Sequence, residues 1–191
     1  MKRWIISDTH FGHENIIKYE KRPYVNAKHM DLFLIANWNK KVKNSDKVFH
    51  LGDFAFGNKE YIKSIVAQLN GDIFLIIGNH DYKKADKWWF EVGIKNVYRY
   101  PIILDNYYIL SHHPLYINSN MPYVNFHGHT HSLSFNSKQY INCSVEVTHY
   151  FPRDLDELIK DNFIKSNEEE EEEDIVYAYD SNGAKIARFI K

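Results

Sequence analysis

Short apolar runs alternate with segments of helical spacing along the first half of the chain. The apolar runs comprise residues 3–7, 48–51 and 72–77. Each is too short for an ordinary helix and lacks polar alternation, which is typical of buried strands. The segments between them, with apolar positions three and four residues apart, comprise residues 14–20, 26–38 and 59–69. This alternation of strand and helix predicts a parallel α/β sheet.

The second half of the chain has a different pattern, with short strands and tight turns. Residues 102–104 and 107–110 flank Asp105-Asn106, a pair that favours a hairpin turn. Further predicted elements are strands at residues 123–126 and 140–147, a helix at 154–164, and strands at 175–179 and 184–189. The last two strands flank a turn-forming sequence and predict a second hairpin.

The length of 191 residues fits one domain, and no internal repeat interrupts it. We therefore expect a single domain over residues 1–191, with an acidic loop at about 166–174 and a C-terminal hairpin at 175–190. Seven consecutive acidic residues lie at positions 168–174, and without them the net charge of −1 becomes about +6. Such a block is typical of a solvated loop, and a mildly basic remainder suits an anionic substrate.

Several observations favour the cytoplasm. No apolar run approaches the length that spans a bilayer, so no membrane partner is expected. The apolar stretch after Met1 ends at Ser7, which is too short for the core of a signal peptide. Cys143 is the single cysteine and cannot form an internal disulfide. The oligomeric state does not follow from the sequence.

Histidine is unusually abundant, with 11 residues, and most of these cluster beside Asp, Asn or Gly. The clustered histidines are His10, His13, His80, His112, His113, His129 and His131. The predicted strands of the first half end at further metal-ligand types, namely Asp8, Asp53 and Asn79. Ligands of parallel α/β sheets bind beyond the carboxyl ends of the strands. The pattern therefore indicates a metal site at this edge.

Two pairs of residues have the spacing of shared metal ligands. Asp8 and His10 are two residues apart, so in extended backbone their side chains point to the same side. His129 and His131 repeat this spacing, and Gly128 before them permits close approach of the backbone. Each pair is therefore expected to reach one cation.

The remaining candidates differ in the role that their position suggests. Asp53 follows Gly52 at a strand end, and its two carboxylate oxygens are suited to bridging two cations. Asn79 and His80 are adjacent and should diverge, so that one binds metal while the other faces the substrate. His112 lies at another strand end.

Five short blocks, taken in order, resemble the calcineurin-like metallophosphoesterase superfamily. The blocks are Asp8-Thr9-His10, Gly52-Asp53, Gly78-Asn79-His80-Asp81, His112-His113-Pro114 and Gly128-His129-Thr130-His131. Together they span residues 8–131, about two thirds of the chain. Each block is a weak signal alone, and the ordered set is specific. The opening sequence also resembles a branch of small bacterial and phage phosphoesterases.

This resemblance implies a four-layer αββα sandwich, in which two mixed β-sheets are flanked by helices. It also implies two divalent cations. The ligands of the first would be Asp8, His10, Asp53 and His131. The ligands of the second would be Asp53 as a bridge, Asn79, His112 and His129. His80 would bind no metal and would contact the phosphate or protonate the leaving oxygen.

The donor types suit the hydrolysis of a phosphomonoester or phosphodiester. Two divalent ions side by side clamp the attacking and leaving oxygens of an in-line displacement. A water that bridges them becomes acidic enough to supply hydroxide near neutral pH. The mixture of imidazole, carboxylate and amide favours Mn, Fe, Ni, Co or Zn over Ca or Mg. The expected substrate is a phosphate ester, with nucleotides among the candidates.

The segment after Asp53 departs from many members of the superfamily. Protein phosphatases of this type follow the bridging Asp with a second Asp and an Arg, whereas this chain has Phe54-Ala55-Phe56. The acid that would orient the catalytic histidine and the arginine that would bind phosphate are missing at this position. Asp81 is adjacent to His80, which makes it a doubtful replacement. The sequence therefore argues against a protein phosphatase.

Other histidines have two interpretations each. His113 competes with His112 for the second cation, and the His-x-Pro spacing of the superfamily favours His112. His13 lies one turn after His10 and either contacts the substrate or orients the start of the first helix. His50 and His127 are expected to face the sheet interior or to support the ligands. His29 and His149 are expected on the surface.

Two further functions remain open. One is a nuclease or an enzyme that processes nucleic-acid ends, in which the cluster Trp88-Trp89-Phe90 would stack on a base, although such clusters are more often part of a core. No contiguous basic stripe supports a nucleic-acid partner. The other is a non-catalytic scaffold on the same fold, which would normally have lost ligands that this chain retains.

Overall fold

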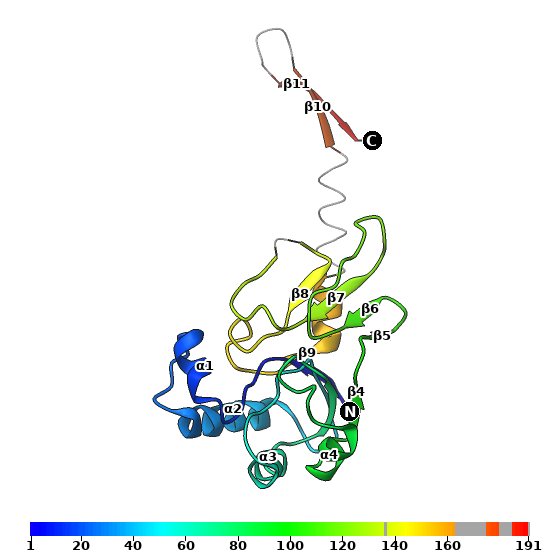
Figure 1. Cartoon of the computed structure of the whole chain (residues 1–191). Helices are drawn as coiled ribbons and strands as arrows, with labels where there is room; N and C mark the ends of the chain where they lie inside the picture. The colour runs from blue at the N-terminus through cyan, green and yellow to red at the C-terminus, as the bar shows by residue number, and fades with distance from the viewer. Residues whose placement is uncertain (136, 163–174, 180–184, 191) are drawn as a thin grey trace. The chain divides into compact units, whose positions relative to one another are not determined.

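The computed structural model describes residues 1–135, 137–162, 175–179 and 185–190 (Figure 1). The chain divides into two compact units, Met1–Leu155 and Asp156–Lys191. All seven predicted metal ligands belong to the first unit. Among the described residues, no helix combines the length and apolar character needed to cross a bilayer.

The second unit contains a strand pair. Strands β10 (Ile175–Tyr179) and β11 (Lys185–Ile190) are antiparallel, with Ile175 opposite Ile190. The acidic block at 168–174 lies outside the described residues, so the predicted solvated loop there stays a prediction. The expectation of a single domain over residues 1–191 likewise stays a prediction.

The first unit contains a five-stranded sheet in the order β4-β3-β2-β1-β9. Its strands are β1 (Arg3–Ile6), β2 (Lys47–His50), β3 (Asp72–Ile76), β4 (Asn96–Tyr98) and β9 (Arg153–Asp154). Strands β1 to β4 are parallel and β9 is antiparallel to β1. The predicted parallel α/β sheet is therefore confirmed. The edge strands β4 and β9 were not predicted, because segments this short produce no periodicity.

Four helices connect the parallel strands. They are α1 (Glu14–Tyr19), α2 (Ala27–Lys41), α3 (Lys59–Val66) and α4 (Asp86–Glu91). The side chain of Asn26 caps α2 by accepting from the backbone N–H of His29, and Asn58 caps α3 in the same way. Apolar side chains of α2, α3 and α4 form one buried cluster with alternate residues of the strands, such as Trp4 and Ile6 of β1.

The second sheet has four strands in the order β5-β6-β7-β8. They are β5 (Ile102–Leu104), β6 (Tyr108–Leu110), β7 (Val124–His127) and β8 (Tyr140–Asn142). The predicted hairpin is present as the antiparallel pair β5 and β6, while β6, β7 and β8 are parallel. Two mixed sheets flanked by helices confirm the expected α/β sandwich (Figure 1).

The prediction of one strand over residues 140–147 was wrong. β8 ends at Asn142, because the next residues leave the second sheet and pair with the end of β1. Ser7 donates its N–H to the carbonyl of Cys143, and Val145 donates to the carbonyl of Ser7. This short link between the two sheets brings the segment after β8 alongside Asp8. Of the helix predicted at residues 154–164, the described residues 155–162 are helical, and all but the first of these belong to the second unit.

Candidate metal centre

The predicted metal ligands lie in the loops that follow strands of both sheets. In the first sheet, Asp8 and His10 follow β1, Asp53 follows β2 and Asn79 follows β3. In the second sheet, His112 follows β6, and His129 and His131 follow β7. The parallel strands of each sheet thus present these side chains at their carboxyl ends, as the sequence predicts.

Backbone hydrogen bonds continue the pairing of β1 and β2 beyond the sheet. Asp8 donates its N–H to Gly52 at 3.0 Å, and His10 donates to Asp53 at 3.0 Å. Gly52 tolerates no side chain here, because an added Cβ would lie 2.6 Å from the nitrogen of Gly78 and 2.7 Å from Nδ1 of His112. The close approach of these loops places the ligands of three strands beside one another.

Five of the seven candidates have left-handed backbone. The φ angles are 57° for Asp8, 51° for His10, 54° for Asp53, 66° for His129 and 48° for His131. The expectation of extended backbone at the two i, i+2 pairs was therefore wrong, although their side chains still converge. Such conformations cost about 1–3 kcal/mol each and cluster at functional sites.

Asp53 lies at the centre of the group. Its Oδ2 atom is 3.6 Å from Nε2 of His10, 3.5 Å from Nε2 of His112 and 3.9 Å from Nε2 of His80. Its Oδ1 atom accepts the backbone N–H of His80 at 2.9 Å. One carboxylate thus contacts groups from both sheets, which is the geometry that a bridging ligand needs.

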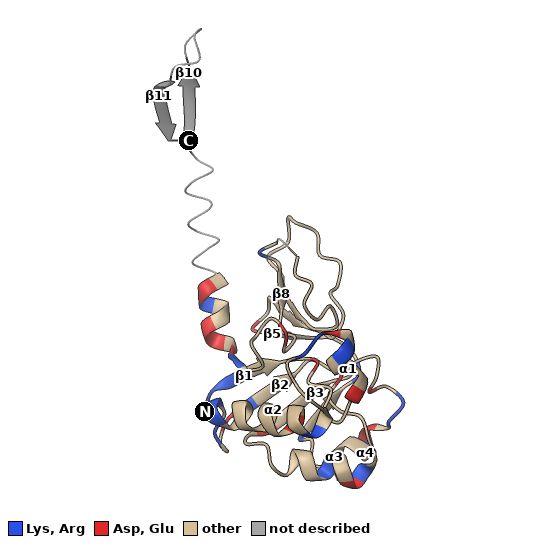
Figure 2. Cartoon of the chain, turned by 90° about the vertical axis from the view of Figure 1, so that its left-hand side faces the viewer, with Lys and Arg blue, Asp and Glu red and all other residues tan. Residues whose placement is uncertain are grey.

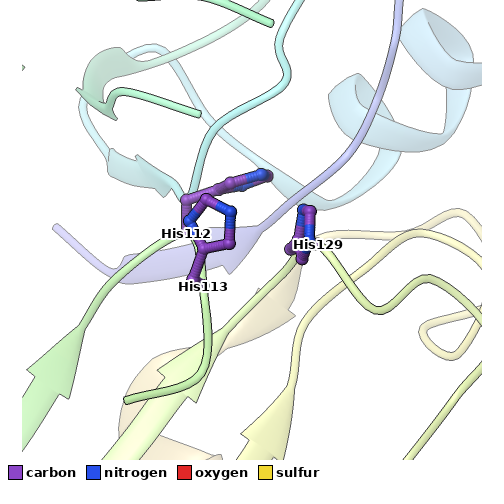
Figure 3. Close-up of side chains that lie close together, drawn as sticks. All are labelled: His112, His113 and His129. Atoms are coloured by element: carbon purple, nitrogen blue, oxygen red, sulfur yellow. The ribbon is translucent and has the colours of Figure 1, made fainter. Parts of the chain in front are cut away.

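Three side chains converge on the side of the second sheet. Oδ1 of Asn79 lies 2.7 Å from Nε2 of His112 and 2.9 Å from Nδ1 of His129. Nδ1 of His112 is fixed by a 2.8 Å contact with the carbonyl oxygen of Leu51. His113 leaves the chain next to His112, but its side chain is exposed and its ring packs against that of His129 (Figure 3). The structure thus directs His112, rather than His113, toward Asp53.

Asp8, His10 and His131 converge on the other side of Asp53, with ligand atoms within 4.8 Å of one another. Oδ2 of Asp8 accepts from the backbone N–H of His129 and the hydroxyl of Ser144. Oδ1 of Asp8 and both ring nitrogens of His10 are buried without a hydrogen-bond partner among the described residues. Buried polar atoms without partners are costly, and a bound cation would satisfy Oδ1 of Asp8 and the unprotonated ring nitrogen of His10.

Burial shifts the pKa values of these groups toward their neutral forms. It raises the pKa of Asp53 to about 7 and lowers that of His112 to about 3. It also lowers the pKa of His10 well below its usual range, and the nearby charge of Arg22 adds to this effect. Neutral imidazoles have the lone pair that a metal requires. Burial raises the pKa of Asp8 as well.

His131 differs from the other histidines. Burial alone would lower its pKa, but the hydrogen bond and charge of Glu146, together with the charges of Asp8 and Glu20, outweigh burial and raise the pKa. Nδ1 of His131 lies 3.0 Å from Oε1 of Glu146. Because a carboxylate only accepts, Nδ1 is the protonated nitrogen and Nε2 is left for another partner.

The carboxylate of the Gly78–Asp81 block supports the backbone. Asp81 accepts the N–H groups of Asp53, Phe54 and Gly78 at 2.7, 3.2 and 3.0 Å. It is fully buried, which raises its pKa to about 7, with the charge of Asp53 adding to the shift. Asp81 therefore orders the loops around Asp53, and its carboxylate is committed to these donors rather than to His80.

His80 and His13 lie beside Phe56 at the edge of the group. The His13 ring stacks on Phe56 at 4.0 Å, and the His80 ring is 5.2 Å from Phe56. The side chain of His80 is 47% exposed, so it is accessible to a substrate. The substrate role of His13 stays a prediction. As expected, His50 and His127 are buried and His29 and His149 exposed.

Comparison with known proteins identifies the family. The model of the calcineurin-like phosphoesterases matches residues 1–188. The chain belongs to the calcineurin-like phosphoesterase family. A relative from Methanocaldococcus jannaschii, described as an uncharacterized protein, is 36% identical over 171 residues, which are 83% of this chain and 90% of the relative. The crystal structure of a protein of unknown function from Aquifex aeolicus, AQ665, is similar with a TM-score of 0.63 and 28% identity, covering 83% of this chain and 98% of that chain.

Membership of the calcineurin-like phosphoesterases supports a metal-dependent phosphoesterase in general. The sequence did not reveal several side chains that contact the candidate ligands. Arg22 and Glu146 form a buried ion pair at 2.6 Å, and Ser144 binds Asp8. These residues lie outside the five family blocks, and nothing local marks them. A buried arginine–glutamate pair 124 positions apart becomes visible only in the folded chain.

Proposed function

We propose that this calcineurin-like phosphoesterase is a binuclear enzyme that hydrolyses a phosphomonoester or phosphodiester. The observation that supports this most directly is the convergence of six side chains of ligand type around Asp53. The first cation would be bound by Asp8, His10, Asp53 and His131. The second would be bound by Asp53, Asn79, His112 and His129. Mn, Fe, Ni, Co and Zn suit these donors.

The donor set fits two divalent cations. Two carboxylates offset only half the charge of two such ions, and burial favours the neutral imidazoles of His10 and His112. The orphaned atoms of Asp8 and His10 gain partners when a cation is bound. Bound divalent ions supply positive charge to the phosphate and lower the pKa of water toward 7.

The protein side chains then perform three tasks. Asp53 joins the two ligand sets, since its carboxylate faces both His10 and His112. His80 protonates the leaving oxygen or binds the phosphate, because its ring is exposed beside Asp53 while its backbone is anchored to the same carboxylate. The carbonyl oxygen of Leu51 contacts Nδ1 of His112 and holds its ring in place. This contact keeps Nε2 of His112 directed at the site when substrate binds.

Charge on the described surface gives no specific support to a nucleic-acid substrate. Basic and acidic residues are interspersed on α1, α3 and α4 (Figure 2). Proteins that bind nucleic acid usually gather lysine and arginine on one face. Trp89 of the aromatic cluster is fully buried in the core, so it is not a platform for a base.

The test uses metal-free full-length protein supplied with Mn²⁺, Ni²⁺, Co²⁺ or Zn²⁺. Hydrolysis of p-nitrophenyl phosphate and bis-p-nitrophenyl phosphate is followed by absorbance, and the substitution Asp53→Asn is the matched negative control. We expect metal-dependent turnover of at least one ester that Asp53→Asn lowers by 100-fold or more, by the usual size of lost electrostatic stabilisation, ~10²–10³. Wild-type protein that binds metal but turns over neither ester with any ion would contradict the proposal.

A further inference from the structure

Arg22 is a charged residue that the fold buries almost completely. It lies in the turn after α1, and only 3% of its surface is exposed. Burying an unpaired guanidinium would cost several kcal/mol, so its donors need partners. Its Nη1 donates to the carbonyl of Thr9 at 2.9 Å, and its Nη2 donates to the carbonyl of Asp8 at 2.7 Å. Both carbonyls belong to the loop that presents Asp8 and His10.

The other partner of Arg22 is Glu146, from the segment that leaves the second sheet. Nε and Nη2 of Arg22 donate to Oε1 of Glu146 at 2.9 and 2.6 Å. The same oxygen accepts Nδ1 of His131 at 3.0 Å. One guanidinium therefore fixes the backbone of Asp8 directly and the ring of His131 through a single carboxylate oxygen.

These contacts oppose two sources of disorder in the site. Asp8 has a φ of 57°, a conformation that other residues must stabilise. His131 is 17% exposed at its side chain, so its ring would otherwise be free to rotate or to change its protonated nitrogen. The Glu146 carboxylate places the proton on Nδ1, which directs Nε2 of His131 away from Glu146 with its lone pair available.

The contacts are also one-sided. Asn79, His112 and His129 make no hydrogen bond with Arg22 or Glu146 in the described structure, and their side chains contact one another and Leu51. One backbone contact links the two sets, because the N–H of His129 donates to Oδ2 of Asp8. Loss of Arg22 or Glu146 should therefore act first on the set of Asp8 and His131, and the side chains of the other set keep their own contacts.

We propose that Arg22 and Glu146 are positioning residues for the first cation, acting through Asp8 and His131. This inference rests on the proposed function, because that function assigns Asp8 and His131 to one cation. In this assignment the pair acts through the ligands Asp8 and His131 and is not itself a ligand. Substitution of Arg22 or Glu146 should therefore weaken the binding of one metal ion more than the binding of the other.

The experiment is calorimetric titration of metal-free full-length protein with MnCl₂. Wild-type protein should bind two ions per chain. Glu146→Ala should weaken one event by about 10–100-fold, the usual effect of removing the partner of a ligating histidine, and leave the other unchanged. Glu146→Gln keeps an oxygen that can accept from both Arg22 and His131, so it should recover most of the affinity.

Arg22→Lys provides a second, independent perturbation. A lysine ammonium cannot reach two carbonyls and a carboxylate in the planar arrangement of a guanidinium, so this variant should weaken the same event as Glu146→Ala. It retains a positive charge and is the variant of choice if Glu146→Ala fails to fold.

Asp46→Ala is the matched control. Asp46 is also a buried carboxylate, but it accepts from Lys2, Lys43 and Trp4 at the amino ends of β1 and β2, opposite to the metal loops. This variant should lose stability without changing either binding event. Equal weakening of both events by Glu146→Ala and by Asp46→Ala would show a merely structural role. Two unchanged events in Glu146→Ala and Arg22→Lys would overturn the inference, whereas wild-type protein that binds no Mn²⁺ would overturn the proposed function instead.

Discussion

Gly128 offers a sensitive test of the geometry around Asp8. A Cβ added at this position would overlap Oγ of Ser7 and Oδ2 of Asp8, and it would lie 2.7 Å from Cβ of Ser7. Ser7 and Asp8 are both fully buried, so neither side chain has space to move aside. The substitution Gly128→Ala must therefore displace Asp8 or shift the backbone that leads into His129.

The magnitude follows from two effects. Overpacking of a buried methyl group costs about 1–3 kcal/mol. Displacing Asp8 also breaks its hydrogen bonds from the His129 N–H at 3.0 Å or the Ser144 hydroxyl at 2.9 Å, and a bond to a charged group contributes about 1.5–3 kcal/mol. We therefore expect Gly128→Ala to lower the free energy of unfolding by about 2.5–6 kcal/mol, which leaves many domains folded, since their stability is about 5–15 kcal/mol.

Two measurements separate stability from site geometry. Urea unfolding in EDTA should report the loss of stability, and Mn²⁺ titration of the folded protein should report an affinity at least tenfold weaker than that of wild type. The control is Gly93→Ala. Gly93 has a φ of +108°, and an added Cβ there would contact Val66, which is none of the candidate ligands. Left-handed backbone costs an alanine about 1–2 kcal/mol, so this variant should lose stability and keep its metal affinity.

A double substitution sharpens the prediction further. Ser7→Ala combined with Gly128→Ala removes the hydroxyl that overlaps the new methyl group, so part of the stability should return. The conflict with Oδ2 of Asp8 remains, and metal affinity should stay low. If Gly128→Ala binds Mn²⁺ as tightly as wild type once the folded fraction is accounted for, the close packing of Gly128 against Asp8 is refuted.

Three further predictions concern the ligands, the metal and acid stability. His112→Ala should abolish one Mn²⁺ binding event in calorimetry, whereas His113→Ala should retain both, because only His112 is buried against Asp53; the reverse order would reassign the ligand. Saturation with Mn²⁺ at about 100 times its Kd should raise the free energy of unfolding by about 2.7 kcal/mol for each independent site, and EDTA should reverse this in thermal melts. The backbone N–H groups of Lys2 and Lys43 hold the pKa of Asp46 at about 2, below its value near 4 in the unfolded chain. The contribution of Asp46 to the free energy of unfolding is therefore complete above pH 4 and is lost as the pH falls toward 2. Urea unfolding of Asp46→Asn should therefore show a smaller loss of stability than wild type between pH 4 and 2, and parallel curves would contradict this.

The strands that position the site follow from local pattern, while their edges do not. The apolar runs of β1, β2 and β3 are buried on a sheet covered by helices, so burial leaves a clear signal in sequence. β9 has two residues, and it exists because Asp154 and Arg153 lie opposite Trp4 and Ile5 of β1. Such a strand depends on a partner about 150 positions away and has no local cause.

The convergence of the ligands could be predicted, but the conformation that achieves it could not. Strand ends and the ordered motif blocks indicated that Asp8, Asp53 and Asn79 would meet. The spacing of Asp8 and His10 suggested extended backbone, whereas both residues are left-handed. The reason lies in tertiary contacts, since Asp8 is pinned by Gly52 and by Arg22. Sequence periodicity describes regular elements and does not extend to loops that such contacts force into unusual conformations.

The segment after Asp53 lacks the acid and the arginine of the protein phosphatases, and the fold places a carboxylate and a guanidinium elsewhere near the candidate ligands. Protein phosphatases of the superfamily have a second acid in the segment after the bridging Asp, whereas here that segment begins with Phe54, which is fully buried in the core. The carboxylate that orders the loop comes instead from Asp81, through the N–H groups of Asp53 and Phe54. The buried arginine is Arg22, and its donors are committed to backbone carbonyls and Glu146. Both charges therefore maintain the ligand geometry from behind the site. Under the proposed function, recognition of the phosphate is left to the cations and to the exposed ring of His80, a division of tasks that would explain how this chain dispenses with the acid and arginine of the phosphatases.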